Sequence, residues 1–240
     1  METIKRTTCR LCGANQLEPV FSIGEQYIND FVPLDRVGKG LKAPLELVTC
    51  GQCSLLQLLH TAPQELLYSR YYWYRSGVTD TMRVALRNIT EEIESMVDLK
   101  PKDVVLDIGA NDGTMLKSFT AKGIYRVGCE PANNLIDSLK VNADYVMNEF
   151  WDYERYMELA KQWGFGKAKV ITAIGMFYDL ENPNKFIKDA QKALTEDGIF
   201  VAQLMCLTPM LNKNDLGNIC HEHLEYYSLD SLRYLFEKNG

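Results

Sequence analysis

Residues 104–114 read VVLDIGANDGT, and this stretch decides the fold class of the chain. It begins as a β-branched, apolar run typical of a buried strand, with an acidic side chain, Asp107, near its end. Gly109 and Gly113 follow, and Thr114 opens a segment of helical character. The first glycine lets the backbone approach a ligand closely, and the second lets the helix pack tightly on the strand. The stretch therefore predicts a strand–loop–helix unit with a ligand at the carboxyl end of the strand.

The same alternation of strands and helices runs through residues 101–240. Short β-branched runs predict the strands, and the amphipathic segments between them predict the helices. At this spacing the alternation predicts an α/β fold built from βαβ units, with a parallel, doubly wound sheet. The strands are expected at 104–108, 125–129, 145–147, 170–174 and 199–204, and the helices at 114–120, 135–141, 154–163, 186–194 and 229–239.

A second pattern lies near the N-terminus, where four of the seven cysteines form two C-x-x-C pairs, Cys9/Cys12 and Cys50/Cys53. Two residues between thiolates allow both sulfurs to bind one ion, so the two pairs supply the four soft ligands of a tetrahedral, structural Zn²⁺ site. A thioredoxin-like redox pair is the alternative, but neither pair lies at the strand-to-helix turn of a βαβ unit. The pattern predicts a small zinc-binding β domain ahead of the α/β domain.

The residues between these two parts have a character of their own. The region starts at Pro63, contains the aromatic run YYWY at 71–74, and continues with apolar residues at spacings of three and four, which predict a helix. We therefore divide the chain into a zinc-binding domain at 1–62, an aromatic and helical linker at 63–100, and a Rossmann-like domain at 101–240.

Composition and charge exclude several classes of protein. The 240 residues are 46% hydrophobic and 24% charged, as in globular proteins with a core. A net charge of −6 without a basic stripe argues against nucleic acid as a partner. The N-terminus has no signal-peptide pattern and no apolar run could span a bilayer, so we expect a cytoplasmic protein without a membrane partner. Thiols stay reduced in the cytoplasm, which favours a metal site over disulfides.

The candidate cofactor site continues at Glu130, which follows the next expected strand, about 20 residues beyond Asp107. A carboxylate at that position accepts two hydrogen bonds from a ribose diol. The loop lacks the full G-x-G-x-x-G pattern of dinucleotide binders, so a pyrophosphate is not its natural ligand. An ordinary βα turn of another α/β enzyme remains the alternative to a cofactor site.

A strand ending in D-x-G, followed by a strand ending in Glu, resembles the S-adenosylmethionine (SAM) dependent methyltransferases of the Rossmann-like class. The resemblance implies that the methionine part of SAM lies against the first strand end and its loop, and that the ribose lies against Glu130. The cofactor-binding residues that it implies are Asp107, Gly109, Asn111, Asp112, Gly113 and Glu130.

Four stretches together resemble a narrower family, the sugar C-methyltransferases with an N-terminal zinc-binding domain. These stretches are the two cysteine pairs, YYWYRS at 71–76 leading to TMR at 81–83, LDIGANDGT at 106–114 and HEHLEYYSL at 221–229. Members of this family methylate a carbon next to the keto group of nucleotide-linked deoxysugars. The resemblance implies a role in deoxysugar biosynthesis, SAM and structural zinc as cofactors, and a nucleotide-linked keto-sugar as the small-molecule substrate.

The family also implies catalytic residues. Methylation at carbon needs a base that removes the proton alpha to a ketone, and the pKa of histidine suits that task. The resemblance assigns the base to His223, with Glu222 as its orienting or proton-shuttling neighbour and His221 as a further candidate. In an extended chain His221 and His223 point the same way and Glu222 the other, so all three line one pocket only if the chain turns. A second metal site or a surface pair is the alternative for this triplet.

The aromatic run supplies two more candidates, Tyr72 and Tyr74, which match family tyrosines that reach the active site. Simple packing between the two domains is the alternative for the whole run. Cys220 departs from the family, which often has a tyrosine just before the His-Glu-His triplet, and residues 177–179 lack an expected histidine. A thiol is a weaker donor than a phenol, so these departures leave the substrate open.

Length is the largest departure. A Rossmann-like methyltransferase has two more strands after the last helix expected here, and the family adds a C-terminal lobe. The chain stops at Gly240, so we interpret it as a C-terminally truncated methyltransferase domain, a fragment, or one half of a split enzyme that works with a missing C-terminal segment or a partner chain. Two other functions stay open: a methyltransferase for another small-molecule acceptor, and a non-catalytic SAM-binding or zinc-scaffold module.

Overall fold

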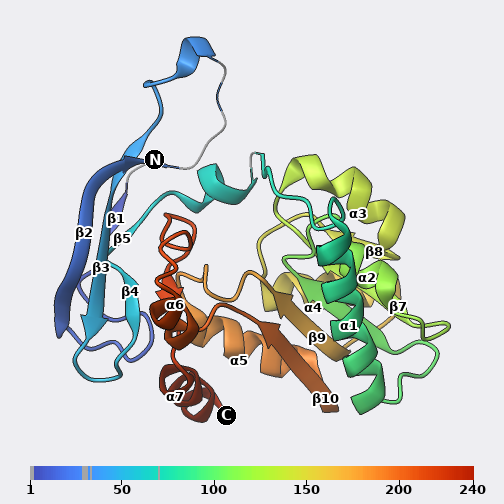
Figure 1. Ribbon diagram of the computed structural model, residues 1–240. Helices are drawn as coiled ribbons and strands as arrows, with labels where there is room; N and C mark the ends of the chain where they lie inside the picture. Colours follow the sequence, from blue (N-terminus) through green and yellow to red (C-terminus); the bar gives the residue numbers. More distant parts are fainter. Residues whose placement is uncertain (1–2, 29–31, 33, 70) are drawn as a thin grey trace. The chain divides into compact units, whose positions relative to one another are not determined.

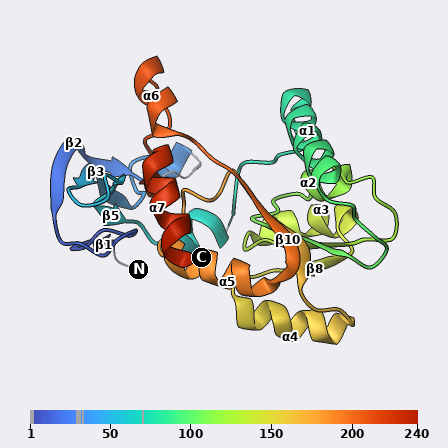
Figure 2. The ribbon, with the colours of Figure 1, turned by 90° about the horizontal axis from the view of Figure 1, so that it is seen from below.

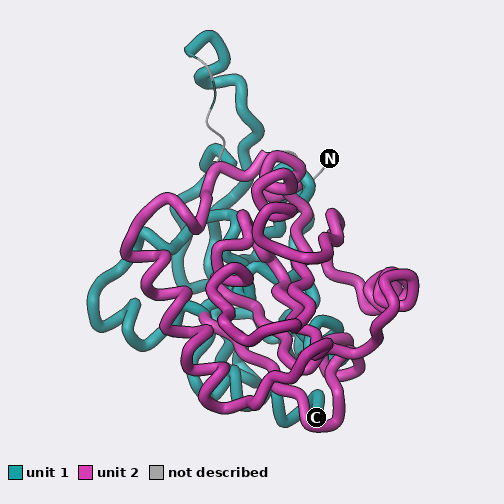
Figure 3. The backbone as a smooth tube through the Cα atoms, turned by 90° about the vertical axis from the view of Figure 1, so that its right-hand side faces the viewer, with its two compact units in different colours: residues 1–67, 176–188, 204–240 teal, residues 68–175, 189–203 magenta. Residues whose placement is uncertain are grey.

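The computed structural model of the protein describes residues 3–28, 32, 34–69 and 71–240 (Figure 1). By contacts the chain divides into two compact units, shown in different colours in Figure 3. Unit 1 consists of residues 1–67, 176–188 and 204–240, and unit 2 of residues 68–175 and 189–203. Each unit has a sheet of its own.

Unit 2 contains the predicted parallel sheet. Its strand order is β10-β9-β6-β7-β8, and every neighbouring pair is parallel. The order reverses next to β6, and in such sheets a ligand binds at the carboxyl ends of the strands beside this switch point. The predicted α/β, Rossmann-like fold is confirmed. The strands are β6 (Val104–Ile108), β7 (Tyr125–Cys129), β8 (Tyr145–Met147), β9 (Ala168–Ile174) and β10 (Leu194–Gln203).

Helices cover both faces of this sheet, as Figure 2 shows for α1, α2 and α3 on one side and α4 on the other. The long helix α1 (Asp80–Met96) begins where the Thr79 hydroxyl accepts a hydrogen bond from the Met82 amide, and its Leu86 and Ile93 join the buried core. The other helical segments are α2 (Thr114–Ser118), η3 (Asn133–Leu135), α3 (Ile136–Asn142), α4 (Tyr153–Trp163) and α5 (Pro183–Ala193), which spans the boundary between the units.

Unit 1 is built on antiparallel strands. A four-stranded sheet has the order β11-β4-β3-β2, and β1 pairs with β5 beside it. These strands are β1 (Ile4–Lys5), β2 (Leu17–Tyr27), β3 (Lys42–Cys50), β4 (Leu56–Leu58), β5 (His60–Thr61) and β11 (Glu225–Tyr226). The helical segments are η1 (Leu34–Arg36), η2 (Glu65–Ser69), which runs into unit 2, α6 (Leu207–Lys213) and α7 (Leu229–Asn239).

The residues that make up unit 1 differ from the domain boundaries predicted from the sequence, which placed residues 101–240 in a single domain. Residues 204–240 return to the cysteine-containing part, and β11 completes its sheet by pairing with β4. Leu224 and Tyr226 are buried in one apolar cluster with Leu45 and Leu47 of β3. Burial of these side chains and the new strand pairing stabilise this arrangement.

Strand β10 lies at the edge of the sheet of unit 2, and in the described part of the chain it pairs on one side only, with β9. None of the described helices combines the length and the apolar character that crossing a membrane requires.

Candidate cofactor, metal and base sites

The loop after β6 has the conformation that its glycines predict. Gly109 and Gly113 both have φ of 77°, a left-handed conformation that favours glycine. The amides of Gly109 and Ala110 donate to the carbonyl of Cys129 at 2.9 and 3.1 Å, so the loop crosses the end of β7. This brings the ends of the first two strands together, as a cofactor site at this edge requires.

Replacing Gly113 with alanine tests the tight packing of this loop. A Cβ atom at Gly113 would lie 2.8 Å from Cβ of Asn142, and φ is positive as well. We expect Gly113→Ala to lower the free energy of unfolding by about 1–3 kcal/mol, measured by urea denaturation. Gly164→Ala is the matched control, because Gly164 has φ of 89° but open space around its Cβ position. Equal losses in both variants would rule out the packing argument.

Asp107 lies at the end of β6 with only 3% of its surface exposed. The hydroxyl of Thr172 on β9 donates to its Oδ1 at 2.6 Å. Burial raises the pKa of Asp107 to about 7, the Thr172 hydrogen bond opposes the shift, and the charge of Glu130 adds to it. Near neutral pH this carboxyl group is therefore poised between its two forms, and a cationic ligand would ionise it.

Glu130 follows β7 and is also buried. Its Oε2 accepts from the Asn111 amide and its Oε1 from the Ala132 amide, both at 2.8 Å. Burial raises the pKa of this carboxyl group, whereas the two amide hydrogen bonds lower it. A carboxylate has about four lone-pair sites, so after these two bonds Glu130 still has acceptors for a ribose diol.

The side chains of Asn111 and Asp112, which lie in the predicted cofactor loop, also hydrogen-bond to the backbone of residues 74–77. The amide of Ser76 donates to Asn111 Oδ1 at 2.9 Å, and the amide of Gly77 donates to Asp112 Oδ2 at 2.8 Å. Asn111 Nδ2 also donates to the carbonyl of Tyr74 at 3.1 Å. These side chains therefore fasten residues 74–77 to the cofactor loop.

The aromatic segment, residues 71–77, is held at a second place. Tyr72 and Asn134 exchange two hydrogen bonds, at 2.9 and 3.0 Å, and Arg75 donates to Ser138 Oγ and to the carbonyl of Asn134. The Tyr71 and Trp73 rings lie 4.5 Å apart, as alternate residues of an extended chain do. The segment that carries Tyr72 and Tyr74 is therefore fixed beside the cofactor loop within unit 2.

The four predicted zinc ligands come together in unit 1. The sulfur atoms of Cys9, Cys12, Cys50 and Cys53 all lie within 4.8 Å of one another, with Cys9–Cys53 at 3.6 Å and Cys12–Cys50 at 3.5 Å. In a tetrahedral site with Zn–S bonds of about 2.3 Å, sulfur atoms lie about 3.8 Å apart. The four side chains are thus close to the separation that a zinc ion would impose.

Backbone amides donate hydrogen bonds to these sulfur atoms, which favours the thiolate form that binds a cation. The amides of Leu11, Ala14 and Gln52 donate to the sulfurs of Cys9, Cys12 and Cys50 at 3.4 to 3.5 Å. The hydrogen bond from Cys53 lowers the pKa of Cys9 to about 4, although burial opposes the shift, and the same hydrogen bond together with burial raises the pKa of Cys53, so a bound cation would have to displace the Cys53 proton. Thiolate is the form that binds metal, so the donor set fits the predicted Zn²⁺.

The His-Glu-His stretch lies in unit 1 and contains the turn that its alternating pattern requires. The amide of His223 donates to the carbonyl of Cys220 at 3.3 Å, which closes the turn. His221 is only 3% exposed, and its Nε2 lies 3.1 Å from the carbonyl of Ala43 on β3. Because a carbonyl only accepts, this nitrogen carries the hydrogen. The ring of His221 therefore anchors the turn to the sheet of unit 1.

His223 is held differently. Its Nδ1 lies 2.8 Å from the carbonyl of Asn218, so Nδ1 carries the hydrogen and Nε2 keeps a lone pair. The ring of Tyr178 packs edge-on against His223, with centroids 4.7 Å apart. Burial lowers the pKa of His223, opposed by the Asn218 hydrogen bond and by the charge of Glu222. His223 is thus a neutral imidazole whose Nε2 keeps its lone pair, the form that a general base needs.

Cys220, where the family often has tyrosine, lies at the start of this turn. Burial, followed by the charge of Glu222, raises the pKa of its thiol to about 12. The group is therefore a neutral thiol near pH 7.

The structure thus gathers the predicted site residues in two groups. Unit 2 holds the predicted cofactor residues together with Tyr72 and Tyr74, and unit 1 holds the cysteines and residues 221–223. Four participants were missed by sequence reasoning: Gly77, Thr172, Tyr178 and Asn218. Thr172 and Tyr178 lie in and just after an expected strand, but strand periodicity does not indicate which side chain each one meets.

A parallel sheet of this order, with acidic residues at the ends of its first two strands and a glycine loop between them, defines the class of Rossmann-like methyltransferase folds. The chain belongs to the methyltransferase-domain family, because residues 80–240 match the family model described as "Methyltransferase domain". Residues 9–68 match a second model, described as "Putative zinc binding domain". The predicted enzyme class is confirmed at the level of the family, and the two sites fit the predicted cofactors, SAM and zinc.

A curated relative is the C-methyltransferase NovU of Streptomyces niveus, which is 27% identical over 234 residues. The match covers 97% of this chain but only 55% of that protein, so the chain spans about half the length of this relative. Among solved structures, the cyclopropane synthase MmaA2 of Mycobacterium tuberculosis has a TM-score of 0.51 at 16% identity, covering 74% of this chain and 67% of that one. A chain from the complex of the Haloferax volcanii Trm112 methyltransferase activator with a methyltransferase has a TM-score of 0.50 at 14% identity, covering 67% and 73%. These two similarities describe the fold.

Proposed function

We propose that this chain belongs to a SAM-dependent enzyme that methylates a carbon atom next to a ketone, with a nucleotide-linked keto-sugar as the acceptor. The observation that carries the proposal is the state of His223, a half-buried neutral imidazole whose Nδ1 hydrogen is fixed on Asn218. Transfer to oxygen or nitrogen needs no carbon acid to be deprotonated, whereas transfer to a carbon next to a ketone requires such a base. The similarity to a protein named as a C-methyltransferase supports the same acceptor atom.

Each group of residues has a defined task in this reaction. SAM supplies an electrophilic methyl group when it is bound. Asp107 would bind the ammonium group of its methionine part, and Glu130 would accept hydrogen bonds from its ribose hydroxyls. Nε2 of His223 would take the proton from the carbon alpha to the ketone, and the carbanion left behind would accept the methyl group as its bond to sulfur breaks, with S-adenosylhomocysteine as the leaving group. The charge of Glu222 stabilises the imidazolium that forms.

The activity assay combines the zinc-loaded chain with SAM and a panel of keto-sugar nucleotides. We expect a product whose NMR spectrum shows a new methyl group on a carbon next to the former ketone. A new methyl group on oxygen or nitrogen would instead establish a methyltransferase for another acceptor. Binding of S-adenosylhomocysteine without any turnover across the panel would contradict the acceptor class proposed for this chain.

Binding of S-adenosylhomocysteine should depend on pH through Asp107. The ionised carboxylate is the form that attracts the ligand's ammonium group, and the pKa of Asp107 in the free protein is about 7. As the pH falls below this value the carboxyl group takes up a proton, so the dissociation constant should rise about tenfold per pH unit. Titration calorimetry from pH 5.5 to 8 measures this slope. Asp107→Asn should bind weakly at every pH and lose the slope, and a wild-type affinity independent of pH would refute the assignment.

A further inference from the structure

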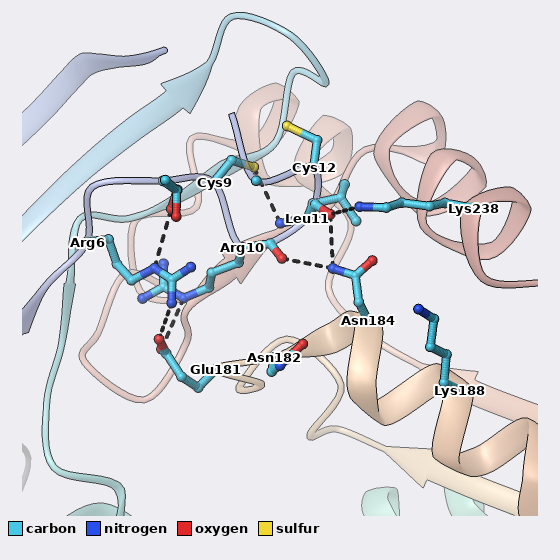
Figure 4. A pocket seen from close by; sticks show the side chains of 12 residues that line it. Arg6, Cys9, Arg10, Leu11, Cys12, Glu181, Asn182, Asn184, Lys188 and Lys238 are labelled. Carbon is cyan, nitrogen blue, oxygen red and sulfur yellow. Dashed lines mark hydrogen bonds and ion pairs between the residues drawn. The ribbon is translucent and has the colours of Figure 1, made fainter. Parts of the chain in front are cut away.

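Arg10, the residue between Cys9 and Cys12, is a buried cation. Its side chain has 0% of its surface exposed. Nη1 donates to the carbonyl of Leu58 at 2.5 Å, Nη2 donates to Thr61 Oγ1 at 2.7 Å, and Nε donates to Glu181 at 3.3 Å. Figure 4 shows Arg10 and Arg6 converging on Glu181 beside the first cysteine pair. A fully buried guanidinium of this kind stabilises a structure only when its neighbours satisfy it.

The second buried charge near Arg10 is Glu225 of β11. Its side chain also has 0% of its surface exposed, and within the described chain neither carboxylate oxygen has a hydrogen-bond partner. Nε of Arg10 lies 3.8 Å from Oε1 of Glu225. Burial raises the pKa of Glu225 well above its usual value, and the charge of Arg10 acts against this shift. Among the groups around Glu225, Arg10 is therefore the one that most stabilises its ionised form.

Arg10 holds both members of one strand pair. On β4 it binds the carbonyl of Leu58 and, at 3.3 Å, the side chain of Gln57, and Gln57 is the register partner of Glu225 on β11. The pair is completed by the amide of Leu58, which donates to the carbonyl of Leu224 at 2.9 Å. Strand β11 has only two residues, so its place depends on these few contacts.

His223 lies two residues before Glu225 and shares its support. The amides of Leu224 and Glu225 donate to the carbonyl of Tyr178, at 2.8 and 3.0 Å, and the ring of Tyr178 packs against His223. A shift of β11 would therefore disturb the packing and the burial of His223.

The position of Arg10 depends in turn on the cysteine pair around it. Its main-chain carbonyl accepts from Asn184 Nδ2 at 3.0 Å, and the next carbonyl, that of Leu11, accepts from Asn184 and from Lys238, both at 2.9 Å (Figure 4). A metal bound by Cys9 and Cys12 fixes the backbone on both sides of Arg10. The metal ligands and these hydrogen bonds would thus act together on the segment that carries the guanidinium.

We propose that Arg10 is a positioning residue that couples the metal site to His223 by holding β4 and β11 together. The role of His223 as base rests on the proposed function, whereas the coupling between the metal and β11 does not. Coupling of this kind is reciprocal: what loosens β11 must also weaken metal binding.

The test compares Arg10→Met with Arg6→Met in the zinc-loaded chain. Arg6 is the matched control, because its side chain also pairs with Glu181 but, within the described chain, donates no hydrogen bond to Gln57, Leu58 or Glu225. In Arg10→Met we expect amide hydrogen exchange at Leu58, Leu224 and Glu225 to rise about tenfold or more, with no such change in Arg6→Met. Zinc affinity, measured by competition with a chelator, should fall about tenfold in the same variant only.

An NMR titration of His223 separates positioning from general loss of stability. The chain has three histidines, so their signals can be assigned by single substitutions. Relaxed burial in Arg10→Met should move the pKa of His223 up towards its usual value, because burial is the influence that lowers it, whereas the Asn218 hydrogen bond and the charge of Glu222 act upwards. Unchanged exchange, zinc affinity and pKa in Arg10→Met, or equal changes in Arg6→Met, would overturn the proposal.

A second variant keeps the test decisive if Arg10→Met does not fold. Arg10→Met combined with Glu225→Met leaves no unpaired charge from the Arg10–Glu225 pair, so we expect it to fold. It should still bind zinc more weakly than wild type, and a wild-type zinc affinity would contradict the coupling. If methyl transfer is unchanged in a variant that shifts the His223 pKa, the coupling stands and the role of His223 as base fails.

Discussion

Replacing His223 with asparagine should reduce the rate of methyl transfer by on the order of 10²–10⁴-fold while leaving the affinity for S-adenosylhomocysteine unchanged. The asparagine amide can take over the donation of Nδ1 to the carbonyl of Asn218, which His223 makes at 2.8 Å. It has no basic nitrogen at the position of Nε2, so only proton removal is lost. Turnover of a keto-sugar nucleotide under saturating SAM measures the effect.

His60→Asn is the matched control for this experiment. His60 is also a partly buried histidine of unit 1, and its Nδ1 lies 3.3 Å from Glu46 rather than near residues 221–223. We expect this variant to keep most of its activity. Full activity in His223→Asn would remove His223 from the reaction, and equal loss in both variants would point to damage to unit 1 instead.

Removing the metal should unfold unit 1. Structural zinc sites have apparent binding free energies of about 10–16 kcal/mol, which equals or exceeds the stability of most single domains, about 5–15 kcal/mol. In unit 1 the four clustered cysteines lie on both sides of Arg10 and just ahead of β4, so loss of the metal removes the bonds that would join these segments. We expect Cys50→Ser, or chelation of the wild-type protein, to abolish hydrogen-exchange protection in strands β1 to β5.

Cys129→Ser serves as the control for loss of the metal. Cys129 is buried at the end of β7 in unit 2, and burial raises the pKa of its thiol. This variant should retain a full equivalent of zinc, measured by atomic emission. Persistence of a protected unit 1 after complete loss of zinc would show that the four cysteines do not support the fold.

The parallel sheet was predictable because its signals are local. Three strands, 104–108, 125–129 and 145–147, have the predicted bounds, and the helix predicted at 154–163 is α4 with one more residue. Boundaries were less accurate where exposed polar residues continue a strand, as in β10, which begins at Leu194 rather than at 199. Strand and helix periodicities repeat every few residues, so they can be recognised in the sequence without knowledge of the tertiary structure.

The polar residues of the site were identifiable, but their partners were not. Asp107 and Glu130 lie at strand ends as predicted, because parallel strands bring their carboxyl ends to one edge. No sequence motif indicated that Asn111 holds the backbone of residues 74–76, or that the ring of His221 anchors a turn on β3. Each of these contacts joins segments far apart in the chain, and a short motif carries no information about them.

The amino-acid sequence by itself determined the parallel sheet of unit 2, its glycine loop and the two cysteine pairs proposed to bind metal, since each depends on residue type at short spacing. Only the tertiary structure decided that residues 176–188 and 204–240 join the cysteine-containing unit, and that Arg10 meets Glu225. A two-residue strand such as β11 has almost no propensity of its own. Its place follows from burial of Leu224 and Tyr226 and from hydrogen bonds to β4, and these free energies exist only once the distant segments have come together.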